Sequence, residues 1–278
     1  MKMVKKILLG LTAAAAVVSF AGCKQVDDPN EAITGSNNDY AVDYTNDGDS
    51  IYRAYKSTSL KHAGALVKVT IENPEADNFS KMGLIFDLHD NSTNNDLKDF
   101  YIMALAGATS KKNFYVSKFE SIQDIQADNF GASTSATAGN PKETEIVQLI
   151  DANKISNYAK NADGSITVYL YYKAFKNTTG DTSKGYYEWG VYQFSDEQAT
   201  VAKAQMKQNT NGATNATLTA LGGSCLKSNT IENAFVLGTG NALPQNQIAV
   251  YAMINPGKTL KGKWQFLDMY LEAEEIEE

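Results

Sequence analysis

Residues 166–173 read Ile-Thr-Val-Tyr-Leu-Tyr-Tyr-Lys, and this stretch decides the fold class. Its even-numbered positions are all apolar or aromatic, whereas the odd-numbered positions include Thr167 and Lys173. A period of two is typical of a β-strand, and β-branched and aromatic residues fit its pleated surface. The pair Asp163-Gly164, a favoured turn sequence, comes just before it. We therefore predict a strand that starts near residue 166.

The same alternation recurs along most of the chain, in segments bounded by Gly, Asn, Asp and Pro. These segments are residues 67–72, 84–88, 101–105, 114–119, 186–194, 234–237, 248–254 and 264–271. Helix is favoured at residues 199–208, where Ser195 can cap the first turn, and a short helix at 145–155 is a second candidate. We predict an all-β fold, an antiparallel β-sandwich of roughly ten or more strands with one or two short helices.

The N-terminal segment has the features of a secretory signal. Lys2, Lys5 and Lys6 precede an apolar run at residues 7–21. That run is shorter than the roughly 20 residues that a membrane-spanning helix prefers, so a retained anchor helix is the less favoured alternative. We predict that residues 1–22 are a signal peptide.

The apolar run ends in Phe20-Ala21-Gly22-Cys23, which resembles the lipobox of bacterial lipoproteins, in particular the looser form of spirochaetes. Ala21 and Gly22 match the two small positions, while Phe20 departs from the usual leucine. The resemblance implies cleavage between Gly22 and Cys23 and lipidation of Cys23, with acyl chains such as palmitate. It thus implies a membrane partner and a cell-envelope location. The outer membrane or cell surface is favoured over the inner membrane, because Lys24 rather than aspartate follows the cysteine.

Composition divides the remaining chain and limits its partners. Residues 23–50 are acidic and rich in Asn, Gly and Ser, without apolar periodicity, so we expect a lipidated cysteine and a disordered tether. Residues 51–278 form the predicted single β-sandwich domain. Loss of the leader lysines changes the net charge from −7 to about −10, which argues against a nucleic-acid partner. Lipidation of Cys23 leaves Cys225 without a partner for a disulfide.

The rhythm of the strands resembles that of lectin-like, concanavalin-type jelly rolls. The resemblance is carried by Gly83-Leu84-Ile85-Phe86, Phe100-Tyr101-Ile102, Phe114-Tyr115-Val116 and Gly262-Lys263-Trp264. It implies a jelly-roll-like fold more than a function. Jelly-roll glycosidases of the laminarinase type carry Glu-x-Asp-x-x-Glu. That spacing does not occur in this sequence, so no catalytic residue is assigned.

Metal and cofactor motifs are weak. His62 and His89 stand alone, without the spacing of a zinc site, and no cofactor site is predicted. Residues 43–49 partly match a calcium-binding EF-hand loop, but Ala54 stands where the bidentate glutamate belongs. Residues 87–99 hold many oxygen-bearing side chains without fixed spacing. Calcium therefore stays an open alternative to two solvated loops.

Aromatic residues are the remaining candidates for ligand binding. Tyr169, Tyr171, Trp189 and Trp264 could form an exposed aromatic face on one sheet, which would suit sugar rings or a partner protein. The alternative is a Tyr-rich core with both faces covered. The main hypothesis is a non-catalytic binding or adhesion module for a glycan or protein ligand. A structural envelope-assembly lipoprotein and a glycoside-active jelly-roll enzyme are the two alternatives.

Overall fold

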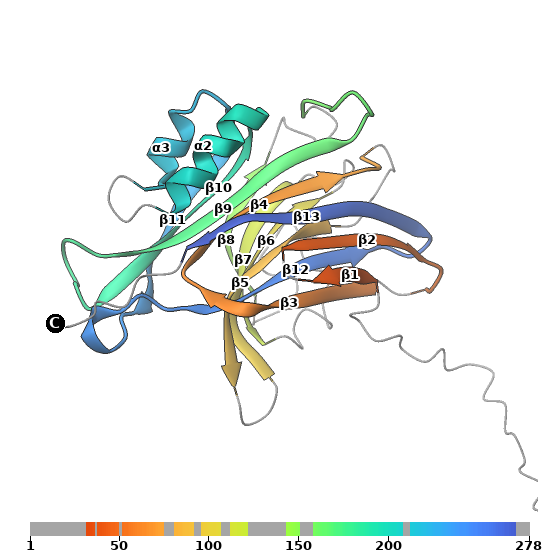
Figure 1. Cartoon of the computed structure of the whole chain (residues 1–278). Helices are drawn as coiled ribbons and strands as arrows, with labels where there is room; N and C mark the ends of the chain where they lie inside the picture. Colours follow the sequence, from red (N-terminus) through yellow and green to blue (C-terminus); the bar gives the residue numbers. More distant parts are fainter. Residues whose placement is uncertain are drawn as a thin grey trace, which may run out of the picture.

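The computed structural model describes residues 32–36, 38–49, 52–74, 81–91, 96–106, 112–121, 143–150, 158–207 and 212–270. They form two antiparallel sheets, one of seven strands in the order β1-β2-β13-β4-β9-β10-β11 and one of six in the order β3-β12-β5-β6-β7-β8 (Figure 1). The strands are β1 Ile33–Ser36, β2 Asp39–Asn46, β3 Tyr52–His62, β4 Gly64–Ile71, β5 Lys81–Asn91, β6 Asp96–Ala106, β7 Lys112–Ser121, β8 Glu143–Ile150, β9 Ile166–Lys176, β10 Lys184–Gln193, β11 Ser224–Val236, β12 Asn246–Ile254 and β13 Lys258–Tyr270. The predicted all-β sandwich is confirmed.

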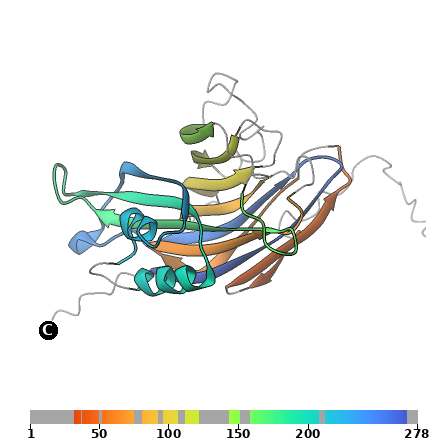
Figure 2. The ribbon, with the colours of Figure 1, turned by 90° about the horizontal axis from the view of Figure 1, so that it is seen from above.

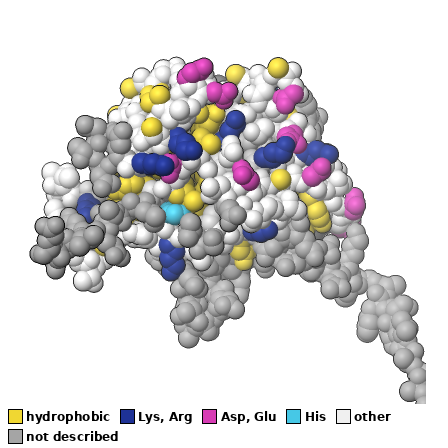
Figure 3. All heavy atoms as spheres, viewed as in Figure 1, with side chains coloured by type: hydrophobic (Ala, Val, Ile, Leu, Met, Phe, Trp, Pro, Cys, Tyr) yellow, Lys and Arg dark blue, Asp and Glu magenta, His cyan; other side chains and the backbone are white. Residues whose placement is uncertain are grey.

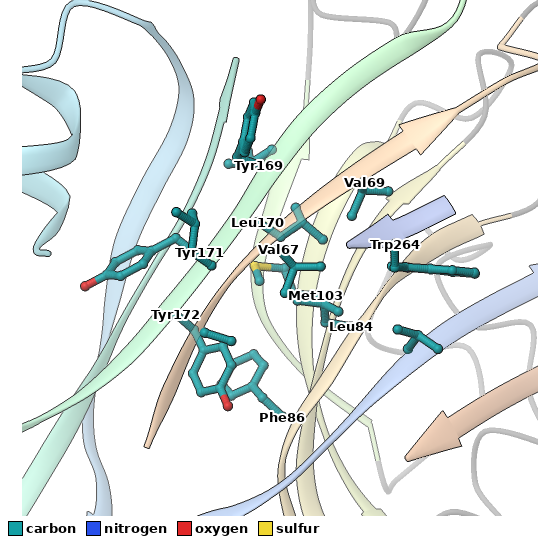
Figure 4. Close-up of a cluster of buried hydrophobic side chains, with 14 of the residues drawn as sticks. Val67, Val69, Leu84, Phe86, Met103, Tyr169, Leu170, Tyr171, Tyr172 and Trp264 are labelled. Carbon is teal, nitrogen blue, oxygen red and sulfur yellow. The ribbon is translucent and has the colours of Figure 1, made fainter. Parts of the chain in front are cut away.

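The core lies between the two sheets. Inward side chains such as Val67 of β4 and Leu170 of β9 meet Leu84 of β5 and Met103 of β6, all fully buried (Figure 4). The buried indole of Trp264 donates a hydrogen bond of 2.9 Å from Nε1 to the carbonyl of Gly83 in the opposite sheet. This bond ties β13 to β5, so packing and polar contacts such as this one fix how the sheets face each other.

The strand predicted from residues 166–173 is confirmed, since β9 begins at Ile166 and continues to Lys176. The residues Asp163-Gly164 form the turn predicted just before this strand. The carboxylate Oδ1 of Asp163 accepts hydrogen bonds from the backbone N and the Oγ of Ser165, at 3.0 and 2.6 Å, and Gly164 adopts a φ of +84°. Glycine adopts a left-handed backbone conformation at little energetic cost, so this turn favours the start of β9.

Two helices lie outside the seven-stranded sheet, on the side away from the other sheet (Figure 2). Helix α2 spans Asp196–Met206 and starts with a capping box, in which Ser195 and Gln198 bond each other's backbone N–H groups. This confirms the helix predicted after Ser195. Helix α3 spans Asn215–Thr219, and a 3₁₀ turn η2 covers Thr239–Asn241. Within the described ranges, no helix has the length and apolar character to cross a membrane.

The predicted domain boundary at residue 51 is wrong. Residues 33–36 and 39–46 form β1 and β2, and β2 pairs with β13 along its whole length, so a large part of the expected tether belongs to the sandwich. Tyr40 and Val42 point into the core, whereas Asp39 and Asp43 are exposed on the other face. Asp39 and Asp43, two of the acidic residues that suggest disorder, lie on the solvent-facing side of β2.

The helix considered at residues 145–155 is also wrong in its described part. Residues 143–150 form β8, which pairs antiparallel with β7. The backbone groups of this segment are paired in the six-stranded sheet. The local sequence is compatible with helix or strand, and pairing with β7 favours the strand.

Candidate functional site

Beside the two helices, no described element covers the outer face of the seven-stranded sheet over β2 and over the parts of β13 and β4 next to it. Side chains alternate there, so the inward residues form the core and the outward residues are mostly polar. Figure 3 shows lysine and acidic side chains interspersed on the side of the molecule drawn in Figure 1. Mixed charges of this kind bind polar ligands better than apolar ones.

The first row of outward side chains crosses the three strands. Gln265 of β13 lies opposite Lys68 of β4 on one side and opposite Asp39 of β2 on the other. Neighbouring strands are about 4.8 Å apart, which places the α-carbons of Lys68 and Asp39 roughly 10 Å from each other. Within the described ranges, these three side chains form no hydrogen bond or ion pair. A cation, an amide and a carboxylate are thus left available in a line.

The second row lies beside the first. Lys263 of β13 stands between Thr70 of β4 and Ala41 of β2. The Lys263 ammonium lies 2.5 Å from Oε1 of Glu72, and this partner raises the pKa of Lys263. Lys263 is therefore cationic throughout the physiological range.

A third row closes the polar face. Lys261 pairs with the carboxylate of Asp43 at 3.0 Å, on the side of Lys263 away from Gln265. Asp43 and Glu72 thus each have a lysine partner. In the part of the chain that the structure describes, the charged side chains of the three rows without a partner, Lys68 and Asp39, belong to the first row.

A groove of about 410 Å³ lies over the first two rows. We name it the row groove; its outward side chains are those of Asp39, Ala41, Lys68, Thr70, Lys263 and Gln265. Gly35 of β1 lines one end. Its φ is +98°, and a Cβ there would come within 2.2 Å of the carbonyl oxygen of Asp39. Only glycine allows β1 to approach β2 so closely, which shapes that end of the groove.

The side chains that line the row groove are suited to non-covalent binding of polar ligands. Of the residues that line it, Asp39 alone carries a carboxylate. Glycoside cleavage needs two carboxyl groups about 5–10 Å apart. The groove therefore lacks the acid–base pair, while it offers ammonium, amide, hydroxyl and carboxylate groups that bind polar ligands.

The expected exposed aromatic face is wrong, because all four of its residues are buried. Trp189 and Trp264 point inward, and Tyr169 packs at 5.2 Å from the ring of Phe194. Tyr171 lies on the outer face, but its hydroxyl donates to the carbonyl of Ala213 at 2.9 Å. Figure 4 shows Tyr169, Tyr171 and Trp264 among the buried cluster. The structure has the Tyr-rich core of the alternative interpretation.

The calcium interpretation is weakened at residues 43–49. Asp43 and Ala54 lie in strands, and the Asp43 carboxylate pairs with Lys261. Asp87 is buried and accepts hydrogen bonds from Tyr187 and Asn246, at 2.7 and 2.6 Å. The residues that the structure describes hold no group of three or more His, Cys, Asp or Glu side chains able to bind a metal ion. Residues 92–95 of the second loop lie outside the described ranges.

Among the described residues, His62 and Cys225 belong to no common metal site. His62 is buried, and burial lowers its pKa, while the nearby Asp268 acts in the opposite direction. Cys225 is half-buried in β11, with its Sγ 3.6 Å from Oγ of Ser228. Gly22 and Cys23, the predicted cleavage and lipidation positions, lie outside the described residues.

Sequence reasoning missed the row groove, although part of its signal is in the sequence. The alternation at residues 67–72 and 264–271 identifies Lys68, Thr70 and Gln265 as sharing a face within their own strands. It cannot show that β13 lies between β2 and β4, since strand order and register are set by contacts between distant segments. Asp39 was assigned to the tether and could not be placed beside them.

No protein-family model matches the chain, and searches of curated proteins and of solved structures found nothing similar to it.

Proposed function

We propose that this chain is a lipid-anchored protein of the bacterial cell envelope whose β-sandwich binds a glycan, without catalysis, in the row groove. The observation that carries the proposal is the row Lys68–Gln265–Asp39, in which three polar side chains have no partner in the described part of the chain. Held on rigid strands, they form a preorganised polar surface.

A glycan suits this groove because its hydroxyl groups both donate and accept hydrogen bonds. The lysines only donate, the carboxylate only accepts, and the amide does both, so together they can satisfy adjacent hydroxyls. The volume of about 410 Å³ is in the range of small-molecule sites, about 300–1,000 Å³. A monosaccharide or a short oligosaccharide would fill it.

A protein ligand is less well supported by this surface. Hot spots of protein interfaces are rich in exposed aromatic and apolar anchors. Among the described residues, Val201 and Val236 are the large apolar side chains classed as exposed, and neither lines the groove.

The anchor rests on the leader, Phe20-Ala21-Gly22-Cys23. One acyl chain binds a bilayer marginally, and two or more hold a protein there stably. Because the sandwich begins at Ile33, the chain from Cys23 to Ala32 reaches at most about 32 Å. Lipid on Cys23 would thus keep β1, and the groove beside it, close to the membrane surface.

The anchor is tested by Cys23→Ala in cells. We expect the variant to leave the membrane fraction, and recovery in that fraction after a high-salt wash would contradict lipid anchoring. Protease treatment of intact cells then distinguishes surface from periplasmic exposure.

Binding is tested on a glycan array with residues 24–278, a chain that keeps every described residue. A fragment starting at residue 51 is unsuitable because it lacks β2 and therefore Asp39. We expect binding to some glycans, and its loss in Gln265→Ala. Lys203→Ala, an exposed lysine on α2, is the control. Absence of binding, or binding that survives Gln265→Ala, would overturn the groove as the site.

A further inference from the structure

We infer that the row groove selects acidic sugars, and that the sugar carboxylate binds between Lys68 and Lys263, beside Thr70. This inference rests on the proposed glycan-binding function and adds to it the chemical class of the ligand. It follows from how cations and carboxylates are distributed over the two rows of the groove.

The cationic corner is formed by β4 and β13. Lys68 and Thr70 are two residues apart on β4, so they point to the same face, and Thr70 lies opposite Lys263. Lys68 and Lys263 are therefore diagonal neighbours, a separation that long side chains bridge. The Lys68 ammonium, the Lys263 ammonium and the Thr70 hydroxyl are neighbours at this corner, although the Lys263 ammonium also engages Glu72 and the Thr70 hydroxyl lies 3.3 Å from that of Thr167. Ammonium and hydroxyl groups can donate hydrogen bonds to a carboxylate.

The two lysines differ in their protein partners. Lys263 is held by Glu72 at 2.5 Å, but an ammonium has three donors, so it retains donors for a ligand. Lys68 has no ion pair or hydrogen bond among the described residues. A ligand carboxylate would give Lys68 the partner that the fold does not supply.

The opposite side of the groove disfavours a second anion. Asp39 lies across Gln265 from Lys68, at the β2 side of the first row. Its carboxylate accepts hydrogen bonds from hydroxyls and repels another carboxylate. A bound acidic sugar is thus oriented with its carboxylate over β4 and its hydroxyls toward Gln265 and Asp39.

The acidic character of the whole chain does not oppose this arrangement. The net charge is −7, but charges more than about 8 Å apart are largely screened at physiological ionic strength. Lys263 is already countered by Glu72 and lies near the charge of Asp163. Lys68 forms no ion pair among the described residues, and Asp39, the carboxylate that lines the groove, lies across Gln265 from it.

The test is an array and calorimetric titration in which uronate- and sialate-containing oligosaccharides are paired with their carboxyl-reduced forms. We expect residues 24–278 to bind the acidic member about tenfold or more tightly, as for a charge-assisted hydrogen bond. The preference should shrink in Lys68→Ala, survive in Lys68→Arg and in the control Lys203→Ala, and weaken as salt is raised.

The outcomes separate the two proposals. Equal binding of acidic and reduced sugars, lost in Gln265→Ala, would overturn the acidic preference and leave glycan binding intact. An acidic preference that Lys68→Ala does not change would place the carboxylate elsewhere and overturn the inference. Binding of neither member would overturn both.

Discussion

The two halves of the outer face of the seven-stranded sheet have the same backbone pattern and opposite chemistry. Over β9 and β10, outward residues such as Tyr171 and Tyr192 are buried beneath helices, and Tyr192 donates to Asn215 of α3 at 3.0 Å. Over β2, β13 and the second half of β4, the outward residues are mostly Lys, Asp, Thr and Gln. The outward residues thus match what covers each half of the face. They are aromatic where helices cover β9 and β10, and polar where solvent or a ligand contacts β2, β13 and β4.

The boundary between the two halves runs along β4. Leu66, near the start of this strand, is fully buried on the same face as Lys68, and α2 packs against β4 and β13. Two residues further along the strand, the half-buried Lys68 begins the row groove. One strand therefore serves the stability of the sandwich at one end and the candidate site at the other.

The largest effect should come from the covered half. We expect Tyr171→Ala to lower the free energy of unfolding by about 3–5 kcal/mol, as for other large buried aromatics, because it leaves a cavity under the helices. Tyr171→Phe removes only the hydrogen bond to Ala213 and should cost about 0.5–1.5 kcal/mol. Urea denaturation measures both. A loss below 1 kcal/mol for Tyr171→Ala would mean that the helices do not depend on this contact.

Gly35→Ala, at the edge of the open half, should cause the second-largest loss of stability. The positive φ and the close approach to Asp39 predict a loss of about 1–3 kcal/mol and a displaced β1. Denaturation and glycan binding should both be impaired. Gly164→Ala is the control, since its φ is also positive but its Cβ would meet no atom within 4 Å. Equal costs at both sites would show that backbone strain alone, and not the approach to β2, is responsible.

The cap of α2 should contribute a smaller amount. Ser195→Ala removes the side chain that accepts from the backbone N–H of Gln198, and we expect a loss of about 1 kcal/mol. Ser195→Asp, which retains a capping oxygen, should recover most of the stability. A loss in thermal stability that is the same for both variants would argue against the cap.

Acidification should lower stability through His62. Burial lowers the His62 pKa in the folded state, so the unfolded chain binds the proton more readily. The contribution of neutral His62 is complete above its ordinary pKa of about 6.5 and is lost as the pH falls from there through the folded-state pKa. Urea midpoints between pH 8 and 5 measure it. We expect a flatter profile in His62→Gln, and an unchanged profile would assign the pH dependence to other groups.

The smallest change in stability is expected for the groove itself. Lys68→Ala and Gln265→Ala remove side chains without partners among the described residues, so unfolding should change by no more than about 0.5 kcal/mol. Thermal melting of both variants measures this. A loss above 1 kcal/mol would show that these residues support the fold, and would weaken their assignment to a binding site.

Local pattern predicted much of the fold and little of the site. The alternation in β9 and the Ser195 cap indicated their elements correctly, because both depend on residues close in sequence. The strands β1 and β2 were missed because pairing with β13 stabilises a segment whose own composition favours disorder. Likewise, the burial of Tyr171 depends on distant helix residues, so a period of two could not show whether that face was open or covered.

The central claim is that the open half of this face is a binding surface, and NMR titration tests it most directly. A glycan identified on the array would be added to ¹⁵N-labelled residues 24–278. The account predicts that amide shift changes centre on Lys68, Thr70, Lys263 and Gln265, with those of α2 and α3 almost unchanged. Shift changes centred on the helices, or spread without a maximum at the row groove, would contradict it.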